Sequence, residues 1–333
     1  MADPFVNELE IGSTVQGGVF LLAEWSLDRT RTGAPYLKAT LADRTGRIEA
    51  RYWDVPQRIA GQLRVGSGVR IDGHVEEYPA GSGQRQVHIE YLAPAEIAGL
   101  DLEDLLPKAK RDLAEMGREL AQVCEDIQNP YLSRLLNDMF SDEVFAAAFS
   151  NAPAAKVYHH ACIGGLLEHS LAVVRLCSFV SQEHPEIDRD SLLTAAILHD
   201  VGKTRAYTAG PVLDFTDVGK LIDHVVEGAL MVQKAIDSIE GFPRTLRNRL
   251  VHAILAHHGA LERGSPVVPK TLEAVALHHA DWLDGSIRGF LDAVESEPVS
   301  ESGWTGYSKM FGTQLYRGSV EPPEEVDEEE IPF

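Results

Sequence analysis

The sequence predicts a protein of two domains, a small β-barrel followed by an all-α domain. Residues 11–91 consist of short segments in which apolar and polar residues alternate, separated by turn residues. From about residue 101 the apolar residues recur at the spacing of an amphipathic helix instead. The length of 333 residues fits about two domains, and a hydrophobic content of 44% is enough to form a core in each.

The first domain is predicted to be a barrel of about five strands. Val87, Ile89 and Tyr91 show the period of two that is typical of a strand, and the sequence DRTG at residues 43–46 is typical of a hairpin turn. A short helix is expected near residues 56–63. The expected strand segments are 14–27, 34–53, 67–79 and 84–92. Because no long helix interrupts them, they favour a closed barrel of the OB type.

The rest of the chain is predicted to be helical. We expect a helical connector whose segment Asp101–Gln128 is partly detached from both cores, and an aromatic segment at residues 304–318 that docks on another surface. The predicted boundaries are 1–95 for the barrel, 96–150 for the connector, 151–318 for the helical domain and 319–333 for a disordered acidic tail. The expected helices span 104–127, 130–149, 165–183, 190–201, 219–238, 244–258 and 270–294.

Composition predicts a cytoplasmic protein without a membrane span. The amino terminus lacks the features of a signal peptide, and the apolar runs are far shorter than the roughly 18 residues of a spanning helix. We interpret Cys124, Cys162 and Cys177 as small buried hydrophobes, because no CxxC pair suggests a disulfide or a thiolate zinc site. The net charge of −21 lies almost entirely downstream of residue 95, so the nearly neutral barrel can still meet a polyanion.

The distribution of histidines predicts a metal site in the helical domain. Eleven of the 13 histidines lie between residues 159 and 279, and His199 directly precedes Asp200. Imidazole and carboxylate together are ligands for a Lewis-acidic divalent metal. We expect this pair to end a helix, with Gly202 at the C′ position that closes it. The other candidate ligands are His169, His224, His257, His258 and Asp281. Separate buried histidines without an ion would leave many ring nitrogens to satisfy.

The order of His169, His199-Asp200 and Asp281 resembles the H…HD…D pattern of the HD superfamily of metal-dependent phosphohydrolases, over residues 150–295. The resemblance implies a site with two metal ions bridged by Asp200, in which histidines matching His224 and His257 complete the ligand set. His258 stays open between a ligand of the second ion and a contact to substrate.

The chemistry of phosphodiester cleavage suggests roles for the remaining groups. Two divalent ions lower the pKa of a bridging water, hold the attacking hydroxide in line and stabilise the departing oxygen. Lys203 is expected to bind a phosphate oxygen, although a lysine at a helix end also has a simpler explanation in the helix dipole. The histidine-rich ligand set favours manganese; iron, cobalt and nickel also fit, and magnesium fits less well.

A barrel before an HD domain, with KVYHHACIGGLLEHS ahead of the first ligand, is similar to the YhaM family of 3′-to-5′ exoribonucleases. The order of segments fits up to the aromatic residues 304–318. The resemblance implies an exonuclease that trims single-stranded RNA, with DNA as an open alternative, to nucleoside monophosphates. It also implies that His159 and His160 contact the terminal nucleotide. The GYP element of cyclic-dinucleotide phosphodiesterases is not found in the sequence, which disfavours that activity.

The barrel supplies candidate contacts to nucleic acid. OB barrels bind single strands by stacking bases on aromatic side chains while basic side chains follow the backbone. Alternation places Tyr52 and Trp53 on opposite faces, so at least one of the two is expected in the core. The candidate substrate contacts are Tyr36, Lys38, Arg51 and Trp53.

The acidic sequence VDEEEIPF at the carboxyl terminus resembles the tip of bacterial single-stranded DNA-binding proteins. That resemblance implies a protein partner that captures the terminal carboxylate and the Phe333 ring. Alternatively, the tail competes with substrate for the arginines of the barrel.

Two other functions remain open at this point. A phosphohydrolase of a small nucleotide would use the same metal site with a regulatory barrel, and an adaptor would bind single strands without catalysis. Retention of His199, Asp200 and Asp281 disfavours the adaptor. Of the other histidines, we expect His252, His278 and His279 to be structural and His184 to be solvated.

Overall fold

The structure is a computed structural model that describes most of the chain. The described residues are 4–30, 32–79, 81, 83–95, 108–155, 162–208, 214–295 and 302–318. The predicted substrate contacts His159 and His160 and the predicted acidic tail, residues 319–333, lie outside these ranges.

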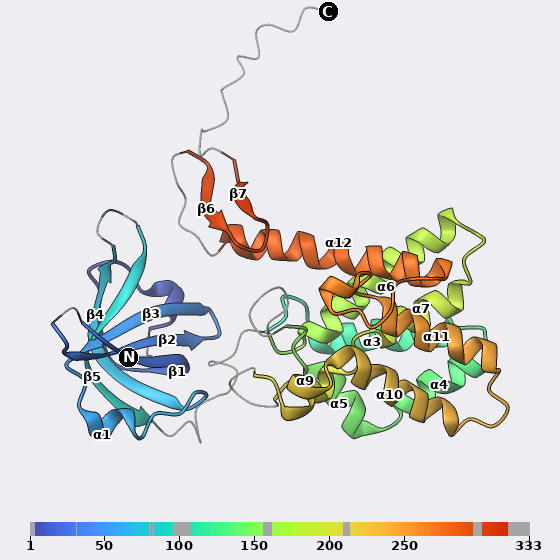
Figure 1. Cartoon of the computed structure of the whole chain (residues 1–333), viewed down its shortest axis with the longest axis horizontal. Coiled ribbons are helices and arrows are strands. Elements are labelled where there is room, and N and C mark those ends of the chain that lie inside the picture. Colours follow the sequence, from blue (N-terminus) through green and yellow to red (C-terminus); the bar gives the residue numbers. More distant parts are fainter. Residues whose placement is uncertain are drawn as a thin grey trace, which may run out of the picture. The chain divides into compact units, whose positions relative to one another are not determined.

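The amino-terminal domain is a closed five-stranded barrel (Figure 1). The strands follow the order β1-β2-β3-β5-β4, in which only the β3–β5 pairing is parallel. The predicted OB-type barrel is therefore confirmed. Its elements are the 3₁₀ turn η1 (Val6–Glu8), β1 (Thr14–Arg29), β2 (Pro35–Asp43), β3 (Gly46–Trp53), α1 (Gln57–Ala60), β4 (Gly68–Glu77) and β5 (Arg85–Ala95).

The barrel core follows the predicted alternation up to one irregularity. Val87 and Ile89 are buried, but Tyr91 is 51% exposed and Leu92 is buried in its place. The cause is a shift of register between β4 and β5, which adds one residue to β5 after Ile89 and so reverses the faces. Tyr91 therefore does not share the inward face of Val87 and Ile89, although the three residues alternate in the sequence. The turn at residues 43–46 is confirmed, since Asp43 pairs with Gly46 across it.

The second domain is helical, and within the described residues no helix is both long and apolar enough to cross a membrane. Its helices are α3 (Leu113–Glu125), α4 (Pro130–Phe140), α5 (Glu143–Asn151), α6 (Gly165–Glu183), α7 (Arg189–Leu198), α8 (Lys203–Ala206), α9 (Asp217–Leu221), α10 (His224–Asp237), α11 (Arg244–Ala256) and α12 (Leu272–Glu295), with the 3₁₀ turn η2 (Leu261–Arg263) between the last two.

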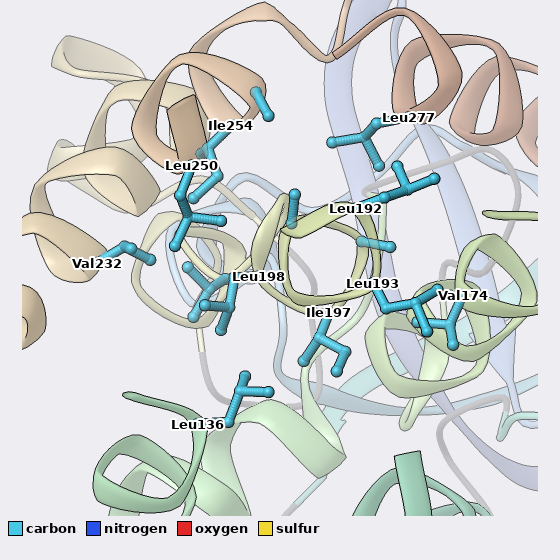
Figure 2. Packing of buried hydrophobic residues seen from close by; sticks show 14 of the residues in the cluster. Leu136, Val174, Leu192, Leu193, Ile197, Leu198, Val232, Leu250, Ile254 and Leu277 are labelled. Atoms are coloured by element: carbon cyan, nitrogen blue, oxygen red, sulfur yellow. The ribbon is translucent and has the colours of Figure 1, made fainter. Parts of the chain in front are cut away.

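Helix α7 is the centre of the helical core. Every residue from Ser191 to Leu198 is buried, so this short helix is enclosed on all sides. Figure 2 shows its leucines and Ile197 directed outward to meet side chains of the surrounding helices. The labelled neighbours are Leu136, Val174, Val232, Leu250, Ile254 and Leu277. Because α7 is fixed on all sides, the two residues that follow it are held at a defined place.

Three predicted helical segments differ from the structure. The segment 130–149 is divided, because the Asp142 side chain caps α5 by accepting from the amides of Val144 and Phe145. The segment 219–238 is divided at Asp223, whose φ of 70° no helix accommodates. The predicted helix 104–127, in the connector segment expected to be partly detached, contains α3, whose buried face belongs to the helical core, so this part of it is not detached.

The cysteines agree with the prediction in two positions of three. Cys124 and Cys177 are buried in the helical core, where burial raises the pKa of both thiols to about 12. Cys162 is only half-buried, so its interpretation as a buried hydrophobe was wrong.

The chain divides into two compact units, residues 1–285 and 286–333. The smaller unit contains the end of α12 and a hairpin of β6 (Trp304–Ser308) and β7 (Thr313–Tyr316). The rings of Phe290 and Phe311 pack edge to face in this unit, with centroids 5.8 Å apart. The aromatic segment thus forms a small sheet, and docking of its exposed rings remains a prediction.

Candidate metal centre and nucleic-acid face

Two helix ends present histidines in the same way. His199 follows the last residue of α7, and its Nδ1 lies 2.8 Å from the carbonyl oxygen of Ala196. His257 follows α11, and its Nδ1 lies 2.7 Å from the carbonyl oxygen of Ile254. A carbonyl oxygen can only accept, so Nδ1 donates in both rings and Nε2 is left as an acceptor. Each helix end therefore aims one nitrogen lone pair into the domain.

Asp200 lies between two groups of candidate ligands. Its Oδ2 is 3.5 Å from Nε2 of His169 and 3.3 Å from Nε2 of His199. Its Oδ1 is 3.4 Å from Nε2 of His224 and 3.6 Å from Nε2 of His257. The Asp200 carboxylate therefore faces four histidines, each from a different helix or helix end. Oδ2 faces His169 and His199, and Oδ1 faces His224 and His257.

Each group has a third member. Asp281, on α12, places Oδ1 3.1 Å from Nε2 of His169, and with His199 these residues offer ligand atoms within 4.8 Å of one another. His258 completes a similar group with His224 and His257. The structure thus brings together all seven predicted metal ligands, as two triads with Asp200 between them.

The Nδ1 atoms of the other three candidate histidines, His169, His224 and His258, also have polar partners. Asp284 Oδ2 lies 2.7 Å from His169 Nδ1, and Asp223 Oδ1 lies 2.8 Å from His224 Nδ1. The Nδ1 of His258 lies 3.0 Å from the carbonyl oxygen of Arg263. A histidine that binds a metal usually donates its other nitrogen to a carboxylate or a carbonyl, which fixes the ring. All five histidines meet this condition.

Asp284 and Asp223 were not predicted as functional residues. Asp284 is three residues after Asp281 and therefore shares its helix face, which is a signal that could have identified it. Asp223 directly precedes His224 and also caps α10 by accepting from the amide of Val225. Its unusual φ could not be read from the sequence.

Buried acceptors face one another at the centre. The Nε2 of His224 and Oδ1 of Asp200 are buried without a hydrogen-bond partner among the described residues, although they lie only 3.4 Å apart. Since His224 donates through Nδ1 to Asp223, both facing atoms are acceptors. Such an arrangement is costly unless a cation lies between the lone pairs. The donor set of imidazole nitrogens and carboxylate oxygens therefore fits divalent metal ions.

The protonation of the site differs between its two halves. Burial lowers the pKa of His224, of His257 and of His258, the last to about 4, so these rings are neutral at pH 7. Burial also disfavours the charged form of His169, but its hydrogen bonds to Asp281 and Asp284 outweigh burial and raise its pKa to about 9. Burial opposes ionisation of Asp200, yet Lys203 and the neighbouring histidines hold its pKa well below the ordinary value.

Lys203 lies against the Asp200 carboxylate. It begins α8 and is buried, and its Nζ is 2.5 Å from Oδ2 of Asp200. Burial alone would lower the pKa of Lys203. The negative charge of Asp200 outweighs burial, so the pKa of Lys203 is raised above its ordinary value. The lysine is therefore a fixed positive charge beside the site, not a solvated residue at a helix end.

Gly202 does not close α7 in the predicted way. Its φ is −63°, so it is not in the left-handed conformation of a C′ glycine, and that prediction was wrong. The glycine is needed for a different reason. A Cβ on Gly202 would lie 2.0 Å from the carbonyl oxygen of His224 and 2.6 Å from the amide nitrogen of Gly228. This close approach sets α10, and with it His224, against the end of α7.

Four other histidines of the helical domain are described, and none of them belongs to either triad. His252 Nε2 accepts from the amide of Lys270 at 2.9 Å, and His278 Nδ1 lies 2.7 Å from the carbonyl oxygen of His257. The His279 ring packs against that of His278, with centroids 4.9 Å apart. His184 is exposed.

The four candidate contacts of the barrel lie together on β2 and β3. Tyr36 is paired with Trp53 across the strands, with ring centroids 4.7 Å apart, and Lys38 is paired with Arg51. Trp53 is 37% exposed, whereas Tyr52 packs against the barrel core, as the alternation predicted. The pairs form a patch of two aromatic and two basic side chains.

Arg51 is already engaged in this patch. Its side chain is mostly covered, and its guanidinium donates to Glu49 Oε2 at 3.1 Å. Lys38 is exposed, so it is the more accessible positive charge.

Comparisons with known proteins agree with this division of the chain. The HD domain family matches residues 166–286, and the family described as an OB-fold nucleic acid binding domain matches residues 20–95. The protein named 3′-5′ exoribonuclease YhaM from Listeria monocytogenes is 32% identical over 285 residues, which cover 84% of this chain and 88% of the relative. The protein of the same name from Bacillus velezensis is 30% identical over 281 residues, covering 84% and 87%.

Proposed function

The chain belongs to the YhaM family of 3′-5′ exoribonucleases, and from that premise we propose that it degrades single-stranded RNA from the 3′ end at a centre of two metal ions. The products are nucleoside monophosphates. Single-stranded DNA is a second substrate of the same centre, because the two ions and Lys203 would act on the phosphate and not on the sugar.

The observation that carries the proposal is the position of Asp200 between two triads. His169, His199 and Asp281 would hold one ion, and His224, His257 and His258 would hold the other. Asp200 would bridge them through its two oxygens, which face the two triads separately. When bound, the pair of ions supplies a nucleophilic hydroxide at neutral pH and stabilises charge on the reacting phosphate.

The residues of the chain have distinct tasks in this proposal. The carbonyl and carboxylate partners of the five Nδ1 atoms keep each ring in one orientation, so little reorganisation is required when substrate arrives. Lys203 is a fixed positive charge that offsets the negative charge gained by the phosphate in the transition state. The buried surroundings strengthen this interaction relative to water.

We propose manganese as the ion, because five imidazoles with two carboxylates form a softer set than magnesium prefers. The barrel would hold the single strand through the patch of Tyr36, Lys38, Arg51 and Trp53. Stacking is tolerant of sequence, which suits an enzyme that must move along any RNA.

The test is a denaturing-gel time course with manganese and 5′-labelled single strands of RNA and DNA of one sequence. The wild-type chain should shorten RNA progressively from the 3′ end. Asp200→Asn removes a charge that both triads share and should abolish the ladder. Asp237→Asn alters an exposed aspartate on α10 that accepts a hydrogen bond from Gln233 Nε2, so it is a matched control that should retain wild-type activity.

The outcomes separate the alternatives. Intact RNA together with hydrolysis of a mononucleotide would replace the exonuclease by a phosphohydrolase of small nucleotides. Intact RNA that is nevertheless bound would indicate an adaptor. Loss of the label from the 5′ end would contradict the proposed 3′-to-5′ direction of cleavage.

We also propose that the acidic tail recruits a protein partner. An affinity purification with and without residues 319–333 would test this proposal.

A further inference from the structure

The barrel carries a second group of histidines, far in sequence from the metal centre. His74 on β4 and His88 on β5 are directly opposite each other in the antiparallel register. Their rings are stacked, with centroids 4.8 Å apart and an interplanar angle of 21°. Both side chains are half-buried, so they are accessible to a small solute but constrained by their neighbours.

Two carboxylates accompany the pair. Glu76, on the same face of β4, places Oε2 3.9 Å from Nδ1 of His88. Glu90, on β5, places Oε1 3.2 Å from Nδ1 of His74. His74, Glu76 and His88 each offer a ligand atom, and these atoms lie within 4.8 Å of one another. Ligands of a tetrahedral zinc ion, at roughly 2.0–2.2 Å from the metal, lie roughly 3.4 Å apart. Small rotations of the side chains would close the difference.

The backbone beneath the cluster is shaped to bring these side chains together. The register of β4 and β5 shifts between Asp72 and Gly73, so that Glu90 has no register partner on β4. Such a bulge redirects a side chain, here toward His74. Gly73 permits the close approach of the strands, since a Cβ there would lie 2.2 Å from the carbonyl oxygen of His88.

We propose that His74, His88 and Glu76 bind a divalent transition-metal ion of the zinc class, with Glu90 holding the His74 ring through Nδ1. Two imidazoles and a carboxylate are an established ligand set for zinc, and three protein ligands leave a fourth position to solvent. A carboxylate on the outer nitrogen is the usual support of such a histidine. This site shares no residue with the centre around Asp200 and does not depend on the proposed nuclease activity.

The ion would lie beside the candidate nucleic-acid patch. His88 is paired in register with Arg51, which is paired with Lys38. A bound ion therefore adds two positive charges at the end of this cross-strand row, within the range over which charges act at physiological salt.

The test is the number of zinc ions bound per full-length chain, measured by equilibrium dialysis followed by elemental analysis. His88→Gln should lose one ion per chain relative to wild type. His184→Gln, which changes an exposed histidine at the end of α6, should lose none. His88→Cys should regain the ion, because a thiolate is also a zinc ligand. Restoration by cysteine separates loss of a ligand from damage to the barrel.

The number of zinc ions bound per chain does not depend on catalysis. Asp200→Asn should lose ions of the helical domain and keep the barrel ion, so a failure of the nuclease proposal would leave this test intact. Wild-type zinc content in His88→Gln, or a loss that His88→Cys does not restore, would overturn the barrel site.

Discussion

Asp284 Oδ2 lies 2.7 Å from Nδ1 of His169, on the side of the ring opposite to the candidate metal centre. The other nitrogen of that ring faces Asp281 and Asp200. Asp284 is thus a positioning residue: it acts on the site only through the orientation and basicity of the imidazole.

The first prediction concerns Asp284→Asn. The change keeps the shape of the side chain but removes its negative charge, so manganese affinity should fall by about 10–100-fold. Titration calorimetry would measure it, with Asp237→Asn as the control. If activity falls while manganese affinity stays at the wild-type value, Asp284 acts in some way other than by supporting His169.

Substitution of Gly202 should affect stability and the site together. An alanine Cβ must displace the backbone of His224 or of Gly228, at a cost of about 1–3 kcal/mol in the free energy of unfolding. Gly117→Ala is the control, since a Cβ there meets nothing within 4 Å and alanine should stabilise α3 by about 0.5–1 kcal/mol. Urea denaturation of the wild type and both variants would measure these changes. A midpoint of Gly202→Ala equal to that of the wild type would refute the close approach at Gly202.

The sequence predicts features that depend on nearby residues better than features that depend on distant parts of the chain. The gathering of these side chains in space was predictable, because His169, His199-Asp200 and Asp281 follow the H…HD…D pattern in the sequence. The partner atoms were not, since the Ile254 carbonyl that holds His257 is a backbone group with no signature in its side chain. The role of Gly202 depends on α10, which is far along the chain from α7. Tyr91 faces outward because of one extra residue in β5, and alternation cannot reveal such an insertion.

Metal binding should release a proton at pH 7. In the metal-free protein the pKa of His169 is raised to about 9, so the ring is protonated at pH 7 and must lose that proton to become a ligand. His258, with a pKa lowered to about 4, is already neutral. Manganese affinity should therefore rise about tenfold per pH unit between pH 7 and 9 and then level off. Calorimetry at pH 7 in two buffers of different ionisation enthalpy would detect the proton, and equal heats would show that none is released.

The aromatic patch of the barrel should contribute to affinity for single strands. Trp53→Ala removes an exposed ring beside Tyr36 and should weaken binding of single-stranded RNA by about 1–3 kcal/mol. Tyr91→Ala removes an exposed ring elsewhere on the same barrel and should change little. Fluorescence anisotropy with labelled RNA in the presence of a chelator would compare them without cleavage. Equal losses in both variants would indicate a general effect on the barrel.

Lys203 can be tested for its two separable effects. If it stabilises charge on the phosphate, Lys203→Gln should lower kcat by about 100–1000-fold, by analogy with the loss of one donor to a developing negative charge. If it only balances Asp200, bound ions would take over that task and kcat would change little. In both cases manganese affinity should not fall, because a positive charge 2.5 Å from the carboxylate competes with the metal.

We expect the first result, since Lys203 is buried and held at the carboxylate that joins the two triads. Lys220→Gln, which removes an exposed lysine of α9 whose Nζ lies 4.0 Å from Asp214, is the matched control and should keep wild-type kcat and manganese affinity. Steady-state rates at saturating RNA and saturating manganese would isolate kcat. A wild-type kcat in Lys203→Gln would leave the lysine as a counter-charge of the metal-free protein and assign the phosphate to the ions alone.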